Sequence, residues 1–439
     1  MNVDPRPIGE ILVDRDACTA SDVETALEIQ SERGGLIGEL LLGHKAITQL
    51  QLTAALGAQF GCVNGWERPN YYAPEGFDDH GARSFRRGGW WQYAVEEAKA
   101  IREGVGLIDA TAFTKHVVKG PGATQFLDWF TCNKLPKVGR INLTYALTDA
   151  GTTRTEYTIV RLGENEYYLV SAGAWTAYDA DYLKKAAEDK AGEFGYIEIQ
   201  DVTTQWGVFA IAGPKSRDVL NEIVKDASPE TVLSNKRFPW LSMREIELGM
   251  CPVRAIRVAY TGELGWELHH PIEMQTYLWD QLMAAGEKYG LKLVGARAQN
   301  WLRQEKSYRA FGTELGRDAT PLEADLPRFV DLGKEFRGKA AMEAKGIRSK
   351  CVTLLIDGPE DADPWGREAL YDGDTKVGRL TSGGYSVAFG KSIGMGYVAP
   401  ELAVVGTKLK VRMLNQLWDA EIVEDSPYDP KNEVIRKDG

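Results

Sequence analysis

The sequence predicts an α+β protein with a small helical module at its N-terminus and a β-barrel at its C-terminus. Three observations carry this prediction: a repeated helical pattern in residues 1–60, alternating helix and strand patterns in residues 61–348, and short β segments in residues 349–439. The chain has 439 residues, and an average domain has roughly 150. We therefore expect three domains with these boundaries.

The N-terminal module contains two similar units. The pattern Ile8–Leu12 recurs as Ile37–Leu41, and Thr19 and Thr48 stand where helix N-caps belong, with Asp22 three residues after Thr19. Each unit reads as a short helix, a turn and a longer amphipathic helix. The units resemble the paired helical repeats of type II secretion ATPases but lack the Arg-Leu-Gly start of those that bind cyclic di-GMP. A docking or packing role is therefore favoured over nucleotide sensing.

The middle part alternates between the two periodicities. Helical patterns cover 94–104, 178–188, 214–227, 272–289 and 296–310, and strand patterns cover 155–161, 166–171, 207–211 and 255–260. After Ser349 the helical patterns end. Short β segments at 351–356, 376–381, 395–398, 408–414 and 418–423 then alternate with Gly, Asp and Pro, as is typical of a small barrel or sandwich.

Composition narrows the ligand class. The net charge is −11 with a pI near 5.2, which argues against nucleic acid or an anionic membrane as the main partner, because both require a positive field. We expect a small-molecule ligand. No apolar run approaches the roughly 20 residues that span a bilayer, and no secretory signal is visible, so a cytoplasmic location is expected.

Metal and disulfide chemistry are not indicated. The five cysteines are widely spaced, and the five histidines include one adjacent pair, His269 and His270. Neighbours on a strand point to opposite faces, so this pair does not build a metal centre. We expect no metal.

A carboxylate at Glu156 is the first candidate site residue. It lies within a β-rich run and shares one strand face with Thr158 and Val160. A buried carboxylate needs hydrogen bonds or a ligand. The commoner arrangement would turn Glu156 to solvent and Tyr157 and Ile159 inward.

Two further segments carry charge next to glycines or aromatic residues. The run from Tyr260 to Glu267 reads as a strand, a glycine turn and a second strand, and a carboxylate such as Glu267 can accept two parallel N–H donors from a heterocycle. The segment from Arg297 to Lys306 is a charged helix. Most such hairpins and helices expose these charges to solvent.

The joint occurrence of these segments resembles a known family. The motifs stand in order at 65–69, 105–109, 119–122, 212–214, 260–267, 303–306, 320–324, 381–385, 394–397 and 428–430. Together they are similar to the folate-binding module of the aminomethyltransferase, or glycine cleavage T-protein, family. The similarity is greatest to the folate half of dimethylglycine and sarcosine dehydrogenases.

The resemblance implies a cloverleaf-like fold whose last part is a barrel, with tetrahydrofolate bound in a central cavity. It places Glu156 at the catalytic acid position and Glu267 at the carboxylate that holds the pterin edge. Arg297 falls at a folate-contacting arginine. The remaining implied cofactor-binding residues are Tyr168 and Val170, on a strand that lines the pterin, and Thr144 and Tyr145, on a segment that covers it.

Two departures from the family pattern bear on function. T-proteins carry Asp at the position of Glu156, and the added methylene moves the carboxyl group by roughly 1.5 Å, enough to alter catalysis. Residues 1–60 stand in place of the flavin-binding half of the dehydrogenases, and no Gly-x-Gly-x-x-Gly fingerprint occurs near the start. We therefore expect that this chain does not oxidise an amine alone.

The expected function is transfer of a methyl or methylene group from a small donor to N5 of tetrahydrofolate, as in folate-dependent demethylases. The donor stays open between an amine, a methyl ether, a sulfonium and a methylenedioxy ring, and so does the choice between 5-methyl- and 5,10-methylenetetrahydrofolate as product. Trp66, Tyr71 and Tyr72 are candidates for binding the donor. The alternative is a folate-binding subunit, itself non-catalytic or dependent on a flavoprotein partner, of a heteromeric amine oxidase.

Overall fold

The computed structural model describes residues 8–14, 17–33, 41, 57–63, 66–74, 77, 84–226, 228 and 232–437. At the N-terminus it contains helices α1 (Ile8–Asp14) and α2 (Ala20–Arg33). The Thr19 hydroxyl accepts a hydrogen bond from the Asp22 N–H at 3.2 Å, and the Asp22 carboxylate accepts one from the Thr19 N–H at 2.8 Å. The N-cap predicted at Thr19 is therefore confirmed. Thr48 and most of the second unit lie outside the described residues. Leu41 is helical, and 58–60, at the end of the predicted helical module, belong to a strand.

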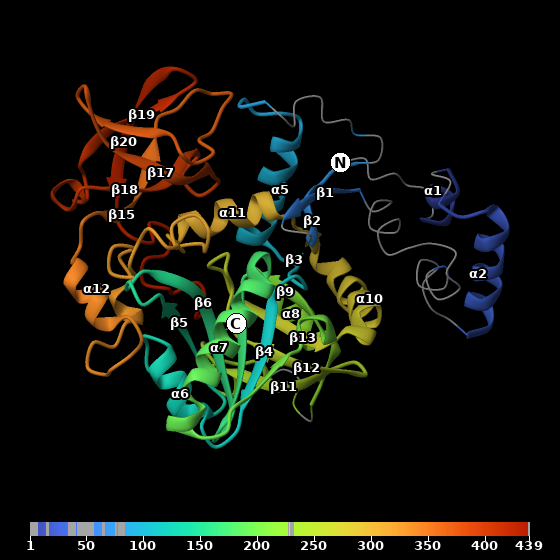
Figure 1. The fold of residues 1–439 in the computed structure, drawn as a ribbon. Coiled ribbons are helices and arrows are strands. Elements are labelled where there is room, and N and C mark those ends of the chain that lie inside the picture. The colour runs from blue at the N-terminus through green and yellow to red at the C-terminus, as the bar shows by residue number, and fades with distance from the viewer. Residues whose placement is uncertain are drawn as a thin grey trace.

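The first large sheet has five antiparallel strands in the order β5-β6-β7-β4-β8. Their bounds are β4 (Thr114–Lys119), β5 (Ile141–Leu147), β6 (Thr153–Gly163), β7 (Glu166–Ser171) and β8 (Glu198–Asp201). Helices α6 (Ala123–Phe130) and α7 (Thr176–Phe194) cover one face (Figure 1). Tyr157 and Ile159 pack under these helices, so the alternation of β6 turns Glu156 to the other face.

The second sheet has seven strands in the order β10-β11-β12-β13-β9-β3-β14. Their bounds are β3 (Gly106–Asp109), β9 (Trp206–Ala212), β10 (Val224–Lys225), β11 (Met243–Leu248), β12 (Cys251–Ile256), β13 (Gly265–Pro271) and β14 (Lys292–Leu293). Trp266, Leu268 and Phe209 form a core with α8 (Ser216–Ile223) and α10 (Gln275–Gly286) on one face. Glu267 and His269 therefore lie on the opposite face.

The uncovered faces of the two sheets are turned toward each other. Val117, Val160, Tyr168 and Val170 of the first sheet share one buried cluster with Ile256 of the second. This cluster joins the sheets into one body. It also brings the two strand faces that carry Glu156 and Glu267 to the same interface.

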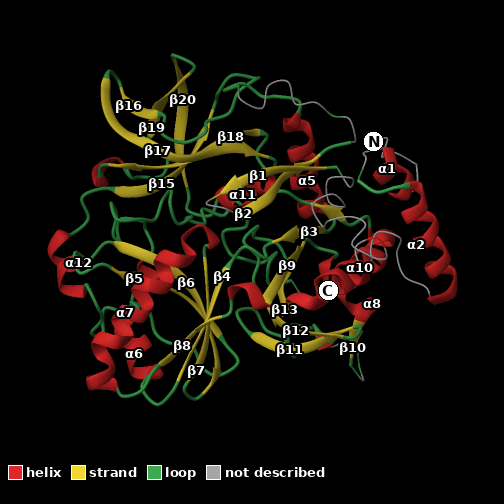
Figure 2. Cartoon of the chain, turned by 45° about the vertical axis from the view of Figure 1, so that its right-hand side comes forward, coloured by secondary structure: helices red, strands yellow, loops and turns green. Residues whose placement is uncertain are grey.

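The C-terminal part is a closed six-stranded barrel in the order β15-β18-β17-β16-β19-β20, which confirms the predicted barrel (Figure 2). Its strands are β15 (Lys350–Ile356), β16 (Ala369–Asp372), β17 (Thr375–Ser386), β18 (Lys391–Val398), β19 (Lys408–Met413) and β20 (Gln416–Val423). The sequence pattern missed β16 because it is only four residues long and ends in a tight turn at Gly373.

Several predicted elements have different bounds. Helix α5 (Trp90–Glu103) begins at Trp90, α8 ends at Ile223 and gives way to β10, and α11 (Ala296–Glu305) ends before Ser307, which has a φ of 52°. The strand predicted at 255–260 is instead β12, which ends at Ile256.

The remaining elements are a hairpin of β1 (Ala58–Val63) and β2 (Trp66–Tyr72), α12 (Lys339–Lys345), and the short 3-10 helices η1 (Gly173–Trp175), η2 (Thr203–Gln205), η3 (Ile272–Met274), η4 (Glu287–Tyr289), η5 (Pro327–Phe329) and η6 (Pro400–Leu402). Within the described ranges, no helix combines the length and apolar character needed to cross a bilayer.

Helix α11 lies between the two-sheet body and the barrel, and its charged end is buried rather than solvated (Figure 1). Arg303 pairs with Glu314 at 2.7 Å and donates to the Ser382 hydroxyl of the barrel at 2.6 Å. Glu305 accepts from Arg102 of α5 at 3.0 Å and from Ser386 of the barrel at 2.6 Å. The solvated face that is usual for a charged helix is therefore the wrong expectation here, because these charges cross-link the parts of the protein.

Replacing Arg303 by Leu should lower the free energy of unfolding by about 3–5 kcal/mol, because the Glu314 carboxylate would stay buried without its cation. Urea unfolding followed by tryptophan fluorescence measures this change. The matched control is Arg412→Ala, at an exposed arginine on β19, which should change the free energy by less than about 0.5 kcal/mol. Equal effects of the two variants would contradict the cross-linking role.

Candidate functional site

Glu156 faces the interface between the sheets from β6. It is paired across the ladder with Tyr145 of β5, and the Tyr145 hydroxyl donates to Glu156 Oε1 at 3.3 Å. Burial raises the pKa of Glu156 to about 7, against the lowering effects of the Tyr145 hydrogen bond and the Arg303 charge. A carboxyl group that titrates near neutral pH can both accept and donate a proton.

Glu267 faces the same interface from β13. Its strand neighbours are Ile256 and Ala210, so the carboxylate stands on an otherwise apolar surface. The His269 ring contacts Glu267 Oε2 through Nε2 at 3.4 Å. The side chain of Glu267 keeps 12% of its surface exposed, which leaves room for a ligand to contact the carboxylate.

Tyr168 and Val170 lie on β7, on the same face of the first sheet as Glu156. Val170 is the ladder neighbour of Thr158, and Tyr168 that of Val160. The Tyr168 hydroxyl forms a hydrogen bond of 3.0 Å with His269 Nδ1, which joins the first sheet to the second. The structure thus places four of these residues on one face of the first sheet: Glu156, Tyr145, Tyr168 and Val170. This face is turned toward the second sheet, which carries Glu267.

Thr144 is placed differently from the expectation. It is buried, and its hydroxyl accepts a hydrogen bond from the Asn133 N–H at 3.0 Å. Because it alternates with Tyr145 along β5, its side chain is turned away from Glu156. Thr144 therefore holds the loop at Asn133 and does not contribute its side chain to the interface between the sheets.

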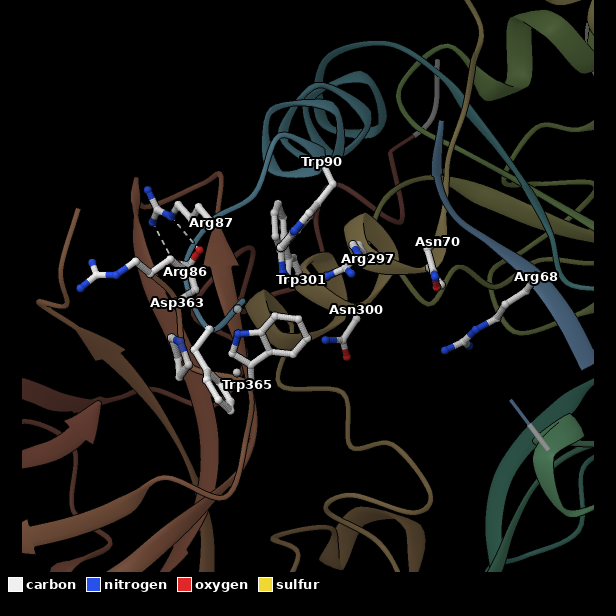
Figure 3. A pocket seen from close by; sticks show the side chains of 15 residues that line it. Arg68, Asn70, Arg86, Arg87, Trp90, Arg297, Asn300, Trp301, Asp363 and Trp365 are labelled. Carbon is white, nitrogen blue, oxygen red and sulfur yellow. Dashed lines mark hydrogen bonds and ion pairs between the residues drawn. The ribbon is translucent and has the colours of Figure 1, made fainter. Parts of the chain in front are cut away.

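Arg297 lines a separate cavity of about 290 Å³, where α11, α5, β2 and the barrel meet (Figure 3). Its guanidinium carbon lies 3.8 Å from the Trp90 ring centroid. Four arginines line this cavity: Arg68, Arg86, Arg87 and Arg297. Asp363 is the carboxylate among the lining residues, and it is bound by Arg87 at 2.8 Å. The cavity is therefore suited to an anionic group.

Arg68 strengthens this assignment. It is exposed on β2 and, among the residues that the structure describes, its side chain has no hydrogen bond or ion pair. A guanidinium that has no acidic partner can pair with an incoming anion.

The aromatic residues that line this cavity differ from those expected to bind the donor. Trp90, Trp301 and Trp365 line it, whereas Trp66, Tyr71 and Tyr72 do not. Tyr71 is buried in a cluster with Trp90 and packs against Phe77 at a centroid distance of 6.3 Å. The sequence could not indicate Trp301 and Trp365, because they come from segments far from β2.

A larger cavity of about 660 Å³ lies between α7, the loop at 311–319 and the barrel, and none of the predicted site residues lines it. In the part of the chain that the structure describes, no group of three or more His, Cys, Asp or Glu residues could hold a metal.

His269 is the residue of the site that sequence reasoning missed. It and His270 point to opposite faces, as predicted: His269 contacts Tyr168, while His270 Nε2 lies 2.7 Å from Gln275 Oε1 on the helix-covered side. The signal was available, because His269 follows Glu267 by two residues on one strand.

Comparison with known proteins gives consistent matches. Residues 50–334 match the GCVT N-terminal domain, and residues 350–429 match the glycine cleavage T-protein C-terminal barrel domain. The chain is 36% identical to the mitochondrial dimethylglycine dehydrogenase of Rattus norvegicus over 385 residues, which cover 85% of this chain and 44% of that protein. It is 30% identical to a probable aminomethyltransferase of Thermococcus kodakarensis, over 78% of this chain and 91% of that protein.

The fold has a solved counterpart. The glycine cleavage system aminomethyltransferase T from Bartonella henselae superposes with a TM-score of 0.72 at 23% identity, covering 86% of this chain and 96% of that chain. This similarity establishes the fold. The chain spans less than half the length of the dimethylglycine dehydrogenases that it matches.

The raised pKa of Glu156 predicts a pH-dependent stability. Because the folded-state pKa of about 7 exceeds the ordinary 4.5, stability from this group is fully present below pH 4.5 and is lost as the pH rises through 7. Glu156→Gln removes this loss. Its free energy of unfolding relative to wild type should therefore increase between pH 5 and pH 8 by on the order of 2 kcal/mol.

Urea unfolding at both pH values measures the difference. Glu166→Gln, at an exposed position on β7, is the control and should show no such increase. A gap between wild type and Glu156→Gln that stays constant with pH would contradict the burial of this carboxyl group.

Proposed function

Because this chain belongs to the glycine cleavage T-protein family, we propose that it transfers a one-carbon unit from a small methylated or methylene-bearing donor to tetrahydrofolate, the cofactor of this family. One observation carries the proposal. Two carboxylates, Glu156 and Glu267, stand on strand faces that are turned toward each other across a mostly apolar interface.

Glu267 is assigned to the pterin edge. An ionised carboxylate can accept two parallel hydrogen bonds from neighbouring N–H groups of an amino-pyrimidine. Its ladder neighbours Ile256 and Ala210 are apolar and can pack against a flat ring. The carboxylate and these neighbours therefore suit the edge of a reduced pterin.

Glu156 is assigned to proton transfer. When bound, tetrahydrofolate supplies a nucleophilic nitrogen, N5, that takes up the one-carbon unit. In its ionised form, Glu156 takes the proton that N5 loses as the new N5–carbon bond forms and a bond from that carbon to the donor breaks. The pKa near 7 supports this role, because a base is most effective when its pKa lies near the working pH.

The arginine-rich cavity is assigned to the acidic end of the folate. Tetrahydrofolate ends in a glutamate, whose carboxylates match the Arg68 and Arg297 guanidinium groups. This assignment keeps the expected role of Arg297 as a folate-contacting residue, with Trp90 and Trp365 as the apolar walls. Trp66, Tyr71 and Tyr72, which are expected to bind the donor, do not line this cavity.

A second function is favoured by the similarity to the dimethylglycine dehydrogenases and to a 4-methylaminobutanoate oxidase. In this function the chain is the folate-binding subunit of an amine oxidase and depends on a flavoprotein partner. Purified protein distinguishes the two functions. Turnover of a methylated donor with tetrahydrofolate by the isolated chain supports the enzyme, and turnover that requires an added flavoprotein supports the subunit.

Glu267→Gln should weaken tetrahydrofolate binding at least tenfold, because the amide presents a donor toward the pterin N–H groups. Isothermal calorimetry measures the affinity. Glu273→Gln, at an exposed glutamate on η3, is the control and should bind as wild type does. Unchanged affinity of Glu267→Gln would refute the pterin role.

Glu156→Gln should bind tetrahydrofolate with near wild-type affinity and slow the transfer at least tenfold, because the amide cannot take the proton. The mass shift of the folate product in a single turnover measures the rate. Glu156→Asp is the matched variant that keeps the carboxyl group and should retain more activity than Glu156→Gln. Full activity of Glu156→Gln would show that the carboxylate is structural.

A further inference from the structure

A chain of three side chains links the two sheets behind the Glu267 carboxylate. Tyr168 of β7 contacts His269 Nδ1 at 3.0 Å, and His269 Nε2 contacts Glu267 Oε2 at 3.4 Å. His269 is fully buried. Each ring nitrogen has a partner: Nδ1 contacts Tyr168 of the first sheet, and Nε2 contacts Glu267 of the second sheet.

The direction of the hydrogen bonds follows from the chemistry of the partners. An ionised carboxylate only accepts, so Nε2 must carry the proton that reaches Glu267. In a neutral ring Nδ1 is then an acceptor, and the Tyr168 hydroxyl donates to it. Burial lowers the pKa of His269 although Glu267 raises it, which agrees with a neutral ring.

The charged groups around His269 do not compete for this arrangement. The Lys115 ammonium donates to three backbone carbonyls, of Thr111, Thr203 and Trp206, at 2.7–3.0 Å. The Arg254 guanidinium lies over the rings of Tyr168 and Trp206, at 5.5 and 4.3 Å from their centroids. Both cations are held by these contacts. The His269 ring is the group that contacts Glu267.

We propose that His269 is a positioning residue for Glu267 and that Tyr168 holds it in the Nε2-protonated tautomer. These hydrogen bonds from Tyr168 through His269 to Glu267 set the rotation of the carboxylate toward the pterin. The proposal rests on the pterin role of Glu267 given above. The hydrogen bond occupies one lone pair of Oε2, so Oε1 and the remaining lone pair of Oε2 stay available to accept from a ligand. Tyr168 then acts on the folate through His269.

The affinity test compares His269→Leu, which has no donor, with His269→Gln, whose amide can donate to Glu267. Calorimetry with tetrahydrofolate should show at least a tenfold loss for His269→Leu and a loss of threefold or less for His269→Gln. Binding of p-aminobenzoylglutamate, which lacks the pterin, should be the same in both variants. His270→Gln, at the neighbouring histidine on the opposite face, is the matched control and should bind tetrahydrofolate as wild type does.

The tautomer gives a readout that a purely structural role would not move. In protein labelled with ¹⁵N in its histidine rings, the His269 signals, identified by their loss in His269→Gln, should show a protonated Nε2 and an unprotonated Nδ1. Tyr168→Phe should shift these signals toward a mixture of tautomers and weaken tetrahydrofolate binding three- to tenfold.

The outcomes separate the two proposals. Wild-type protein that binds tetrahydrofolate while His269→Leu and Tyr168→Phe bind it equally well overturns the positioning role and leaves the proposed function intact. If His269→Leu does not fold, Tyr168→Phe decides, and unchanged tautomer signals and affinity in that variant overturn the proposal. Wild-type protein that does not bind tetrahydrofolate overturns both.

Discussion

The buried ionic contacts of α11 are the interaction on which the rest of the structure depends. Arg303 reaches Glu314 and the barrel serine Ser382, and Glu305 reaches Arg102 of α5 and the barrel serine Ser386. A buried charge without its partner costs several kcal/mol, roughly, so these groups tolerate little displacement. Because Arg297 lies in the first turn of the same helix, the contacts also fix the arginine-rich cavity relative to the sheets.

The two carboxylates of the site differ in their surroundings, and this difference suits two roles. Glu156 is close to Arg303 and Tyr145, yet burial dominates and raises its pKa to about 7. Glu267 instead contacts the His269 ring and has a partly exposed surface. These surroundings support the proposals that Glu156 exchanges a proton and that Glu267 accepts hydrogen bonds.

Periodicity predicted the parts of the fold and site that depend on local alternation. The period of two separated Glu156 from Tyr157 on β6 and His269 from His270 on β13. It could not show that a second sheet covers the Glu156 face, because that requires contacts between distant segments. For the same reason the pattern did not reveal that the charged end of α11 is buried, or that Thr144 holds the loop at Asn133.

We propose that Glu156 and Glu267 contact one and the same bound pterin from opposite sheets. A crystal structure of the protein with tetrahydrofolate tests this proposal. Density for the pterin is expected between β6 and β13, with its amino-pyrimidine edge on Glu267 and N5 toward Glu156. A pterin bound elsewhere, such as between Trp90 and Trp365, or one that contacts a single one of these carboxylates, would contradict it.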